Sequence, residues 1–218
     1  MNISEEIIRL AKQLHASGAC PGHGGNISVK ETTNTFYCTP TCRNKSTIIA
    51  GELAYLSDKT GVVERLSGGK ESMEFIHLHY GIYQKYPKIG AIIHAHPVEL
   101  MAFAINGLDI EARCVPESYI ELKDKIPCTK NYETPGTKEL LESVLSLLNE
   151  YPSIIMKQHG LLLVGKDLHH AIDLYEESIA LATAVSNALL LRRNLGLDSI
   201  VPIIEKGKLQ ELDKFRKE

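Results

Sequence analysis

The segment GAIIHAHP, residues 90–97, ends an apolar run with two histidines, His94 and His96, that are separated by one residue. Successive side chains of a β-strand point to opposite faces, so both imidazoles emerge from one face while Ile93 and Ala95 point to the other. This spacing suits two adjacent ligands of one metal ion. The alternative interpretation is a pair of solvated or hydrogen-bonded polar residues at a strand end.

A third histidine, His159, favours the metal. It closes a second apolar segment, SIIMKQHG (residues 153–160), which we interpret as a strand that continues into another strand after a hinge at Gly160. Glycine at that position lets a backbone or a ligand approach closely. Three neutral imidazoles that leave a fourth position open are typical of catalytic rather than structural zinc.

The cysteines offer a weaker alternative metal site and an indication of compartment. Cys38 and Cys42 could be two zinc ligands, but the chain has no second pair with the spacing of a zinc finger. Five cysteines without a CxxC motif favour a reduced, cytoplasmic compartment. The N-terminal segment carries two early acids and no basic stretch, so we do not expect a secretory signal.

Composition argues against two classes of partner. The formal net charge is −3 and no run of five basic residues occurs, which argues against a nucleic-acid-binding protein. No apolar stretch reaches the ~18 residues that a membrane span needs. A length of 218 residues fits one large domain or two small ones, and the absence of a linker rich in Gly, Ser or Pro favours a single domain over residues 1–218, with a core at about 4–195. The tail, residues 197–218, is either a helix that covers the site or a charged end.

Short strands and helices are mixed along the chain, which predicts an α/β fold. Ser4, Thr137 and Asp167 are the expected N-caps of three helices. The predicted helices cover residues 4–17, 72–87, 97–106, 138–150 and 167–195. The predicted strands lie within residues 25–30, 35–40, 51–66, 89–96 and 153–165, and the first three runs form two hairpins.

Five short motifs, in this order and at these intervals, resemble the class II aldolase and adducin family. They are GGNISV (24–29), CTPTC (38–42), ESME (71–74), HAHP (94–97) and KQHG (157–160). The resemblance covers about residues 4–195. It implies a three-layer α/β/α sandwich with a largely antiparallel central sheet. It also implies a homotetramer with active sites at the subunit interfaces.

The resemblance implies a metal-dependent lyase that cleaves a small sugar phosphate, as fuculose 1-phosphate aldolase does. Zn²⁺, or another divalent transition metal, would be held by His94, His96 and His159. The metal would act as a Lewis acid that stabilises an enediolate, and Glu74 would move protons between carbon and oxygen. A sugar-acid phosphate decarboxylase or a pentulose-phosphate 4-epimerase of the same family is the enzymatic alternative. A non-catalytic, adducin-like assembly module is the alternative from another class.

The family's phosphate site is formed by three turns, and two of them depart from the usual pattern here. By motif, the residues of this site are Gly25, Asn26, Thr41, Cys42, Ser72 and Met73. The usual TPTG has become TPTC, and the usual PSSE has become ESME. These changes remove a glycine and a hydroxyl donor and add an acid, Glu71. We therefore expect a weakened phosphate site, or a different head group.

The catalytic side chains also show departures. The family spacing, counted back from His94, puts Phe75 rather than Glu74 at the position of the base. Either one residue is inserted near the start of that helix, which we favour, or the base is lost. The aldolases take a tyrosine from the neighbouring subunit as an acid. An ungapped count places Pro116 there, and Tyr119 is the substitute candidate.

Overall fold

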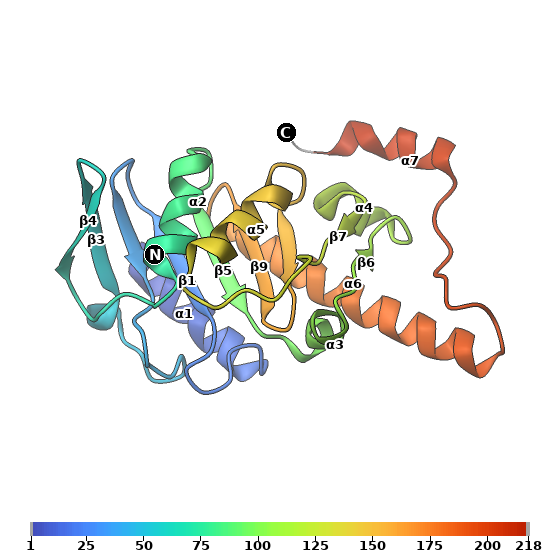
Figure 1. The fold of residues 1–218 in the computed structure, drawn as a ribbon, viewed down its shortest axis with the longest axis horizontal. Helices are drawn as coiled ribbons and strands as arrows, with labels where there is room; N and C mark the ends of the chain where they lie inside the picture. The colour runs from blue at the N-terminus through green and yellow to red at the C-terminus, as the bar shows by residue number, and fades with distance from the viewer. Residues whose placement is uncertain (1, 217–218) are drawn as a thin grey trace.

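A seven-stranded sheet forms the centre of the molecule, which we describe from a computed structural model for residues 2–216 (Figure 1). The strand order is β4-β3-β2-β1-β5-β9-β8, and every neighbouring pair is antiparallel. The strands are β1 (Asn26–Lys30), β2 (Thr35–Cys38), β3 (Ala54–Lys59), β4 (Val62–Ser67), β5 (Ala91–Ala95), β8 (Ser153–Met156) and β9 (Gly160–Gly165). The expected antiparallel sheet is confirmed.

Helices cover both faces of this sheet and complete the expected three layers. One face packs against α1 (Ile3–Ala16), α3 (Val98–Asn106) and α6 (Leu168–Asn194), with which it forms the larger apolar core. The other face packs against α2 (Tyr80–Lys85), its preceding turn and α5 (Lys138–Leu148), which lie on the near side in Figure 1. Strand β5 contributes to both cores, because Ile92 and Ile93 point to opposite faces.

The central position of β5 fixes what surrounds the two histidines. Its antiparallel register sets His94 opposite Asn26 of β1 and opposite Leu162 of β9. The strand ends at Ala95, so His96 lies immediately beyond it, and Pro97 is the N-cap of α3 rather than part of its first turn.

Two of the three expected N-caps are present and one is wrong. The side chains of Thr137 and Asp167 accept hydrogen bonds from the amides of Leu140 and His170, respectively. The first helix is capped by Asn2, whose side chain accepts from the Ser4 amide and which forms a capping box with Glu5. Ser4 lies inside the helix, because a better cap stands two residues before it.

The helix expected from residue 72 begins later and with a different geometry. Residues Phe75–His79 form a π-helix, and the α-helix α2 follows directly. The amides of Leu78 and His79 both donate to the Glu74 carbonyl, at 2.9 and 3.3 Å. A π turn holds one residue more than an α turn, so this turn accommodates an extra residue at the start of the helix.

The segment around His159 forms the two strands expected, but the first ends before the histidine. Strand β8 ends at Met156, and His159 lies in the tight turn that leads into β9, which begins at Gly160. In this turn Gln158 adopts a left-handed conformation, with φ of 55°. The imidazole is therefore held by a turn between two paired strands rather than by a strand.

Several short elements were not predicted. They are the helices α4 (Pro116–Leu122) and α7 (Lys206–Leu212), the 3₁₀ turns Ala50–Glu52 and Asp213–Phe215, and the two-stranded sheet of β6 (Ile110–Glu111) and β7 (Lys125–Ile126). Helix α7, from the C-terminal tail, packs on α4. No helix between residues 2 and 216 is long and apolar enough to cross a membrane.

The packing beneath the π turn gives a stability prediction. Phe75 is fully buried, with its ring edge-on to Phe36 at a centroid distance of 5.8 Å, whereas Phe215 is 57% exposed. We expect Phe75→Ala to lower the free energy of unfolding by roughly 3–5 kcal/mol, because it leaves a cavity in the core. The control Phe215→Ala should cost under about 0.5 kcal/mol. Urea unfolding at equal protein concentration measures both, and equal losses would contradict this packing.

Candidate metal centre

Three imidazoles converge at the end of β5. One nitrogen from each of His94, His96 and His159 lies within 4.8 Å of the corresponding nitrogens of the other two. Among residues 2–216, no other cluster of three or more histidine, cysteine or acidic side chains is placed to hold a metal ion. The ring centroid of His94 lies 4.5 Å from that of His96 and 4.6 Å from that of His159. The structure thus brings together two strand-end histidines and one turn histidine that are distant in sequence.

Burial keeps these imidazoles neutral. Loss of hydration lowers the pKa of His94, His96 and His159 to about 4 in each case. The Nδ1–H of His94 donates to the carbonyl of Leu161 at 2.9 Å, so its Nε2 carries the free lone pair. A backbone bond of this kind fixes both the tautomer and the ring orientation of a ligand. The group therefore presents lone pairs at neutral pH.

Two glycines allow the close approach of the histidines. A Cβ atom at Gly160 would lie 2.6 Å from the Ala95 carbonyl oxygen and 2.6 Å from Cδ2 of His96. Gly25 has φ of +68°, and a Cβ there would lie 2.7 Å from the His94 carbonyl oxygen. No side chain fits at either position without displacing the strand that carries the ligands. The expected close approach at Gly160 is confirmed, and what approaches is β5 itself.

Glu74 is directed at the same point. Its Oε2 accepts a hydrogen bond of 2.6 Å from Nδ2 of Asn26 and lies 3.5 Å from Nε2 of His94, while its Oε1 lies 3.6 Å from Nε2 of His159. The carboxylate is buried, and Oε1 has no hydrogen-bond partner. The structure places Glu74, not Phe75, at the cavity, since the Phe75 ring packs in the core.

These observations fit a divalent transition metal. A buried acidic oxygen without a donor costs free energy unless a cation or a proton is present. Three neutral imidazoles with one adjacent carboxylate are a donor set that suits zinc and also several related ions. The site residues present would therefore hold such an ion without rearranging the fold.

The residues expected to bind phosphate line the same cavity, which has a volume of about 310 Å³. They are Gly25, Asn26, Thr41, Cys42, Ser72 and Met73. Ser72 is buried, whereas Met73 is 66% exposed at the mouth. Three further lining residues, His23, Lys45 and Pro135, were missed by the sequence analysis. A single lysine in a polar segment gives no signal of burial, because most lysines are exposed.

Cys42 stands where the resemblance leads one to expect a glycine. Its φ of 53° lies in the left-handed region, which glycine adopts more readily than cysteine. Cys38 is fully buried, and its Sγ donates to the Thr39 carbonyl and to Ser72. The structure does not gather Cys38 and Cys42 into a metal-binding group, so the alternative zinc pair is not supported.

The acid introduced by ESME does not face the cavity. Glu71 lines a separate depression, together with Arg65 and Lys70. Its charge still reaches the neighbourhood of the cavity, because burial and, to a smaller extent, Glu71 raise the pKa of Cys38, whose Sγ contacts Ser72. The expected weakening of the phosphate site stays a prediction. The π turn and the bridge of Glu71 to Pro40 direct successive residues of the motif to different sides.

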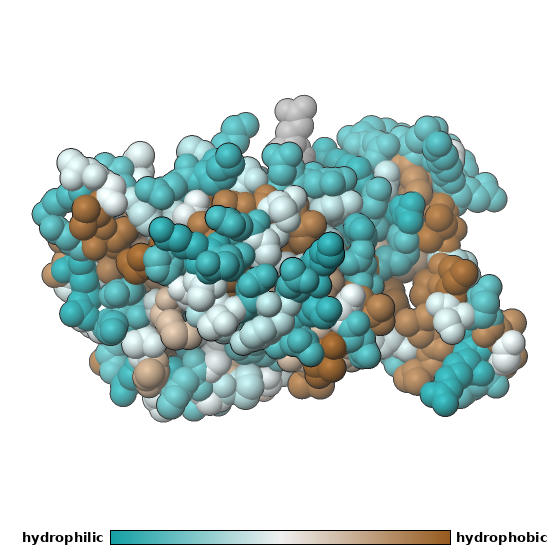
Figure 2. Space-filling model, in the orientation of Figure 1, coloured by the Kyte–Doolittle hydropathy of each residue, from teal (hydrophilic) through white to brown (hydrophobic). Residues whose placement is uncertain are grey.

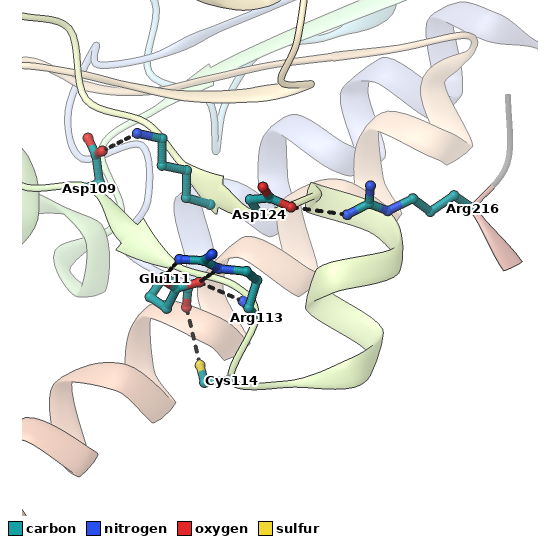
Figure 3. Close-up of polar contacts among 7 residues, drawn as sticks. Asp109, Glu111, Arg113, Cys114, Asp124 and Arg216 are labelled. Carbon is teal, nitrogen blue, oxygen red and sulfur yellow. Dashed lines mark hydrogen bonds and ion pairs between the residues drawn. The ribbon is translucent and has the colours of Figure 1, made fainter. Parts of the chain in front are cut away.

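Tyr119 is not brought to the cavity of its own chain. Its hydroxyl donates to Asp213 at 2.7 Å, and the guanidinium of Arg216 lies 3.9 Å from its ring centroid. Arg216 also reaches Asp124, beside the ion pair of Glu111 with Arg113 (Figure 3). The C-terminal tail therefore covers α4 rather than the metal centre.

Comparison with known proteins identifies relatives of this chain. Residues 5–185 match the model of the Class II Aldolase and Adducin N-terminal domain family. A 5-methylthioribulose-1-phosphate/5-deoxyribulose-1-phosphate aldolase of Escherichia coli is 29% identical over 217 residues, which cover 99% of this chain and 96% of that protein. A 3-oxo-tetronate 4-phosphate decarboxylase of Pectobacterium atrosepticum is 31% identical over 175 residues, 79% of this chain and 78% of that protein. A solved L-fuculose 1-phosphate aldolase shares the fold, with a TM-score of 0.81, 22% identity and coverage of 97% and 94%.

Substitution of Gly160 tests whether the close approach of this residue to the end of β5 is needed for metal binding. We expect Gly160→Ala to weaken zinc binding at least ~10-fold, because the added methyl group displaces the strand end that orients two ligands. Gly51→Ala is the matched control, since a Cβ there meets no atom within 4 Å. Competition with a chromogenic chelator measures both affinities. Wild-type affinity in Gly160→Ala would contradict the geometry.

Substitution of Cys42 tests whether the backbone at this position is left-handed. Because φ is positive, Cys42→Gly should be more stable than Cys42→Ala by roughly 0.5–1 kcal/mol, after allowing for the greater freedom of glycine in the unfolded chain. Urea unfolding of the two variants measures the difference. An alanine variant as stable as the glycine variant would show that this turn has ordinary backbone geometry.

Proposed function

The chain belongs to the class II aldolase and adducin family, and on that premise we propose that it is a metal-dependent lyase that cleaves a carbon–carbon bond in a small sugar phosphate. The observation that carries the proposal is the convergence of three neutral imidazoles and one carboxylate in a single cavity. The cavity also contains the small and hydroxyl-bearing residues of the expected anion site. Relatives named as aldolases and a decarboxylase make a lyase the coarse assignment.

His94, His96 and His159 are the proposed ligands of a divalent ion. Such an ion, when bound, supplies Lewis-acid chemistry that draws electron density from a carbonyl group and so favours an enediolate. The histidines contribute by remaining neutral and by being held rigidly, through the Leu161 carbonyl in the case of His94. Strand pairing on both sides of β5 fixes the position of the donor set before substrate arrives.

Glu74 is the proposed acid and base. In the direction of cleavage a proton leaves the hydroxyl group of the departing carbon, the carbon–carbon bond breaks, and the remaining fragment takes up a proton at carbon. A carboxylate held at the cavity can accept and return such a proton. The hydrogen bond from Asn26 orients Oε2, and Oε1 is without a donor.

We propose a homotetramer with active sites between subunits. Support comes from exposed apolar side chains on the end of α6 and on the segment after it, where brown residues gather at the right of Figure 2. They are Leu190, Leu191, Leu195, Leu197, Ile200 and Ile203. Exposed apolar groups of this kind are typical of interaction surfaces. Tyr119 could serve a neighbouring site only if Asp213 and Arg216 released it.

A decarboxylase acting on a sugar-acid phosphate is the second candidate. The relative named as a 3-oxo-tetronate 4-phosphate decarboxylase supports it. Loss of carbon dioxide and retro-aldol cleavage both leave electrons on the carbon next to a carbonyl, so the same donor set serves both. The released product distinguishes them, since one reaction yields an aldehyde and the other carbon dioxide. We further propose a cytoplasmic location, which the free state of all five cysteines supports.

Turnover tests the proposed roles. We expect zinc-loaded protein to release dihydroxyacetone phosphate from at least one of a panel of ketose 1-phosphates, and chelation to abolish the release. Glu74→Gln should retain zinc but lower kcat by about 10²–10⁴-fold, because the proton carrier is lost. Glu71→Gln is the matched control, since Glu71 lies in another depression. A coupled assay with α-glycerophosphate dehydrogenase measures the rates.

Two outcomes would contradict this assignment. Full activity in Glu74→Gln would remove the carboxylate from the mechanism. Zinc bound at one ion per chain, with neither aldehyde nor carbon dioxide formed from any phosphorylated substrate, would favour an assembly module that has kept a metal site.

A further inference from the structure

Lys45 is a buried cation beside the metal centre. Lys45 is only 2% exposed, and by residue volume it is the largest of the fully buried residues among those described. The ammonium donates to two backbone carbonyls, those of His23 at 3.4 Å and Arg43 at 3.3 Å. Both distances are longer than those of a usual charged hydrogen bond. These contacts do not replace the hydration that the ammonium loses.

Within residues 2–216, no carboxylate lies at salt-bridge distance from the Lys45 ammonium. The acidic groups nearest to it electrostatically are the thiols of Cys20 and Cys38. Burial raises the pKa of each thiol to about 11, so both are neutral near pH 7. A buried ammonium without a counter-charge is unfavourable, and burial lowers the pKa of Lys45 from its ordinary value. An anion bound in the cavity would favour the charged form of this side chain.

The charge faces the cavity rather than the apolar core. Lys45 lines the cavity together with Thr41, Ser72 and the metal-binding histidines. Its charge also contributes, after burial, to the lowered pKa of His94 and His96. The ammonium is therefore close to both the expected anion site and the metal centre, inside a space of about 310 Å³.

We infer that Lys45 is a substrate-binding residue whose ammonium contacts the phosphate group of the substrate. The inference rests on the proposed function in taking the substrate to be a small sugar phosphate. It also accounts for the altered turns. Met73 offers no hydroxyl, and a charged donor in a desolvated cavity binds an anion more strongly than the hydroxyl that is missing. Glu71 lines a separate depression, so its carboxylate is not a lining group of this cavity.

A purely structural role for Lys45 makes a different prediction. If its two hydrogen bonds hold the turn of residues 41–47 in place, Lys45→Met should unfold more easily than the wild type. If the charge exists for an anion, the same variant should be at least as stable in phosphate-free buffer, because methionine removes an uncompensated buried charge and retains most of the volume. Stability without ligand therefore separates the two roles.

The experiment titrates inorganic phosphate into the zinc-loaded protein, with affinity from calorimetry and stability from thermal unfolding. We expect Lys45→Met to bind phosphate at least 10-fold more weakly than the wild type, about 1.4 kcal/mol. It should also lose most of the rise in Tm that phosphate produces. Lys70→Met is the matched control, because Lys70 is exposed and lies in the depression of Glu71. Lys45→Arg, which keeps the charge, should retain measurable phosphate binding.

Three results would overturn the inference. The first is equal phosphate affinity in Lys45→Met and the wild type, which is expected if the metal ion alone holds phosphate. The second is no phosphate binding by the wild type. The third is a lower Tm for Lys45→Met than for the wild type in phosphate-free buffer. None of these requires turnover, so failure of the proposed lyase reaction is recorded separately. If turnover occurs, Lys45→Met should lower kcat/KM more for a ketose phosphate than for the free ketose, mainly through KM.

Discussion

The pairing of β5 with both β1 and β9 is the constraint on which the site depends. It sets His94 between Asn26 and Leu162, and it brings the turn that carries His159 against the end of β5. That approach requires Gly160, whose missing side chain leaves room for the Ala95 carbonyl and the His96 ring. Asn26, whose position is fixed by the same register, donates a hydrogen bond to the Glu74 carboxylate and so orients it. One hydrogen-bonded ladder thus positions the donor set.

Desolvation gives these groups their chemical character. The imidazoles lose their affinity for protons because burial disfavours the charged form, and this leaves them as neutral donors. Glu74 and Lys45 are buried at the same cavity and form no ion pair with each other. Opposite charges held apart in a poorly solvated space are suited to ligands that carry both signs. A divalent cation near Glu74 and a phosphate near Lys45 would complete such an arrangement.

The sequence was informative wherever a local pattern determined local structure. The alternation in residues 89–96, the two hairpins and the caps at Thr137 and Asp167 follow from short-range preferences, and all are present. The motifs placed the three histidines and Glu74 in one family pattern, and the structure brings them to one cavity. The β-branched and aromatic content of the strands predicted the sheet, although its order depends on long-range pairing.

Apart from the N-cap expected at Ser4, the features that the sequence did not predict involve long-range contacts. Whether the helix after Glu74 starts with a π turn depends on the packing of Phe75 against Phe36, which no local pattern encodes. The tail helix α7 packs on α4, and just after it Asp213 and Arg216 contact Tyr119 and Asp124, about 90 residues away in sequence. Lys45 is buried in part against a segment distant in sequence, since its ammonium donates to the carbonyl of His23, 22 residues away. Such placements follow from tertiary contacts, so composition and periodicity cannot reveal them.

Diffraction from zinc-loaded crystals at two wavelengths that bracket the zinc absorption edge tests the central claim most directly. The account predicts one anomalous peak per chain, within about 2.0–2.3 Å of nitrogens from His94, His96 and His159. A peak beside Cys38 or Cys42, or full zinc occupancy elsewhere with the three imidazoles unligated, would contradict it.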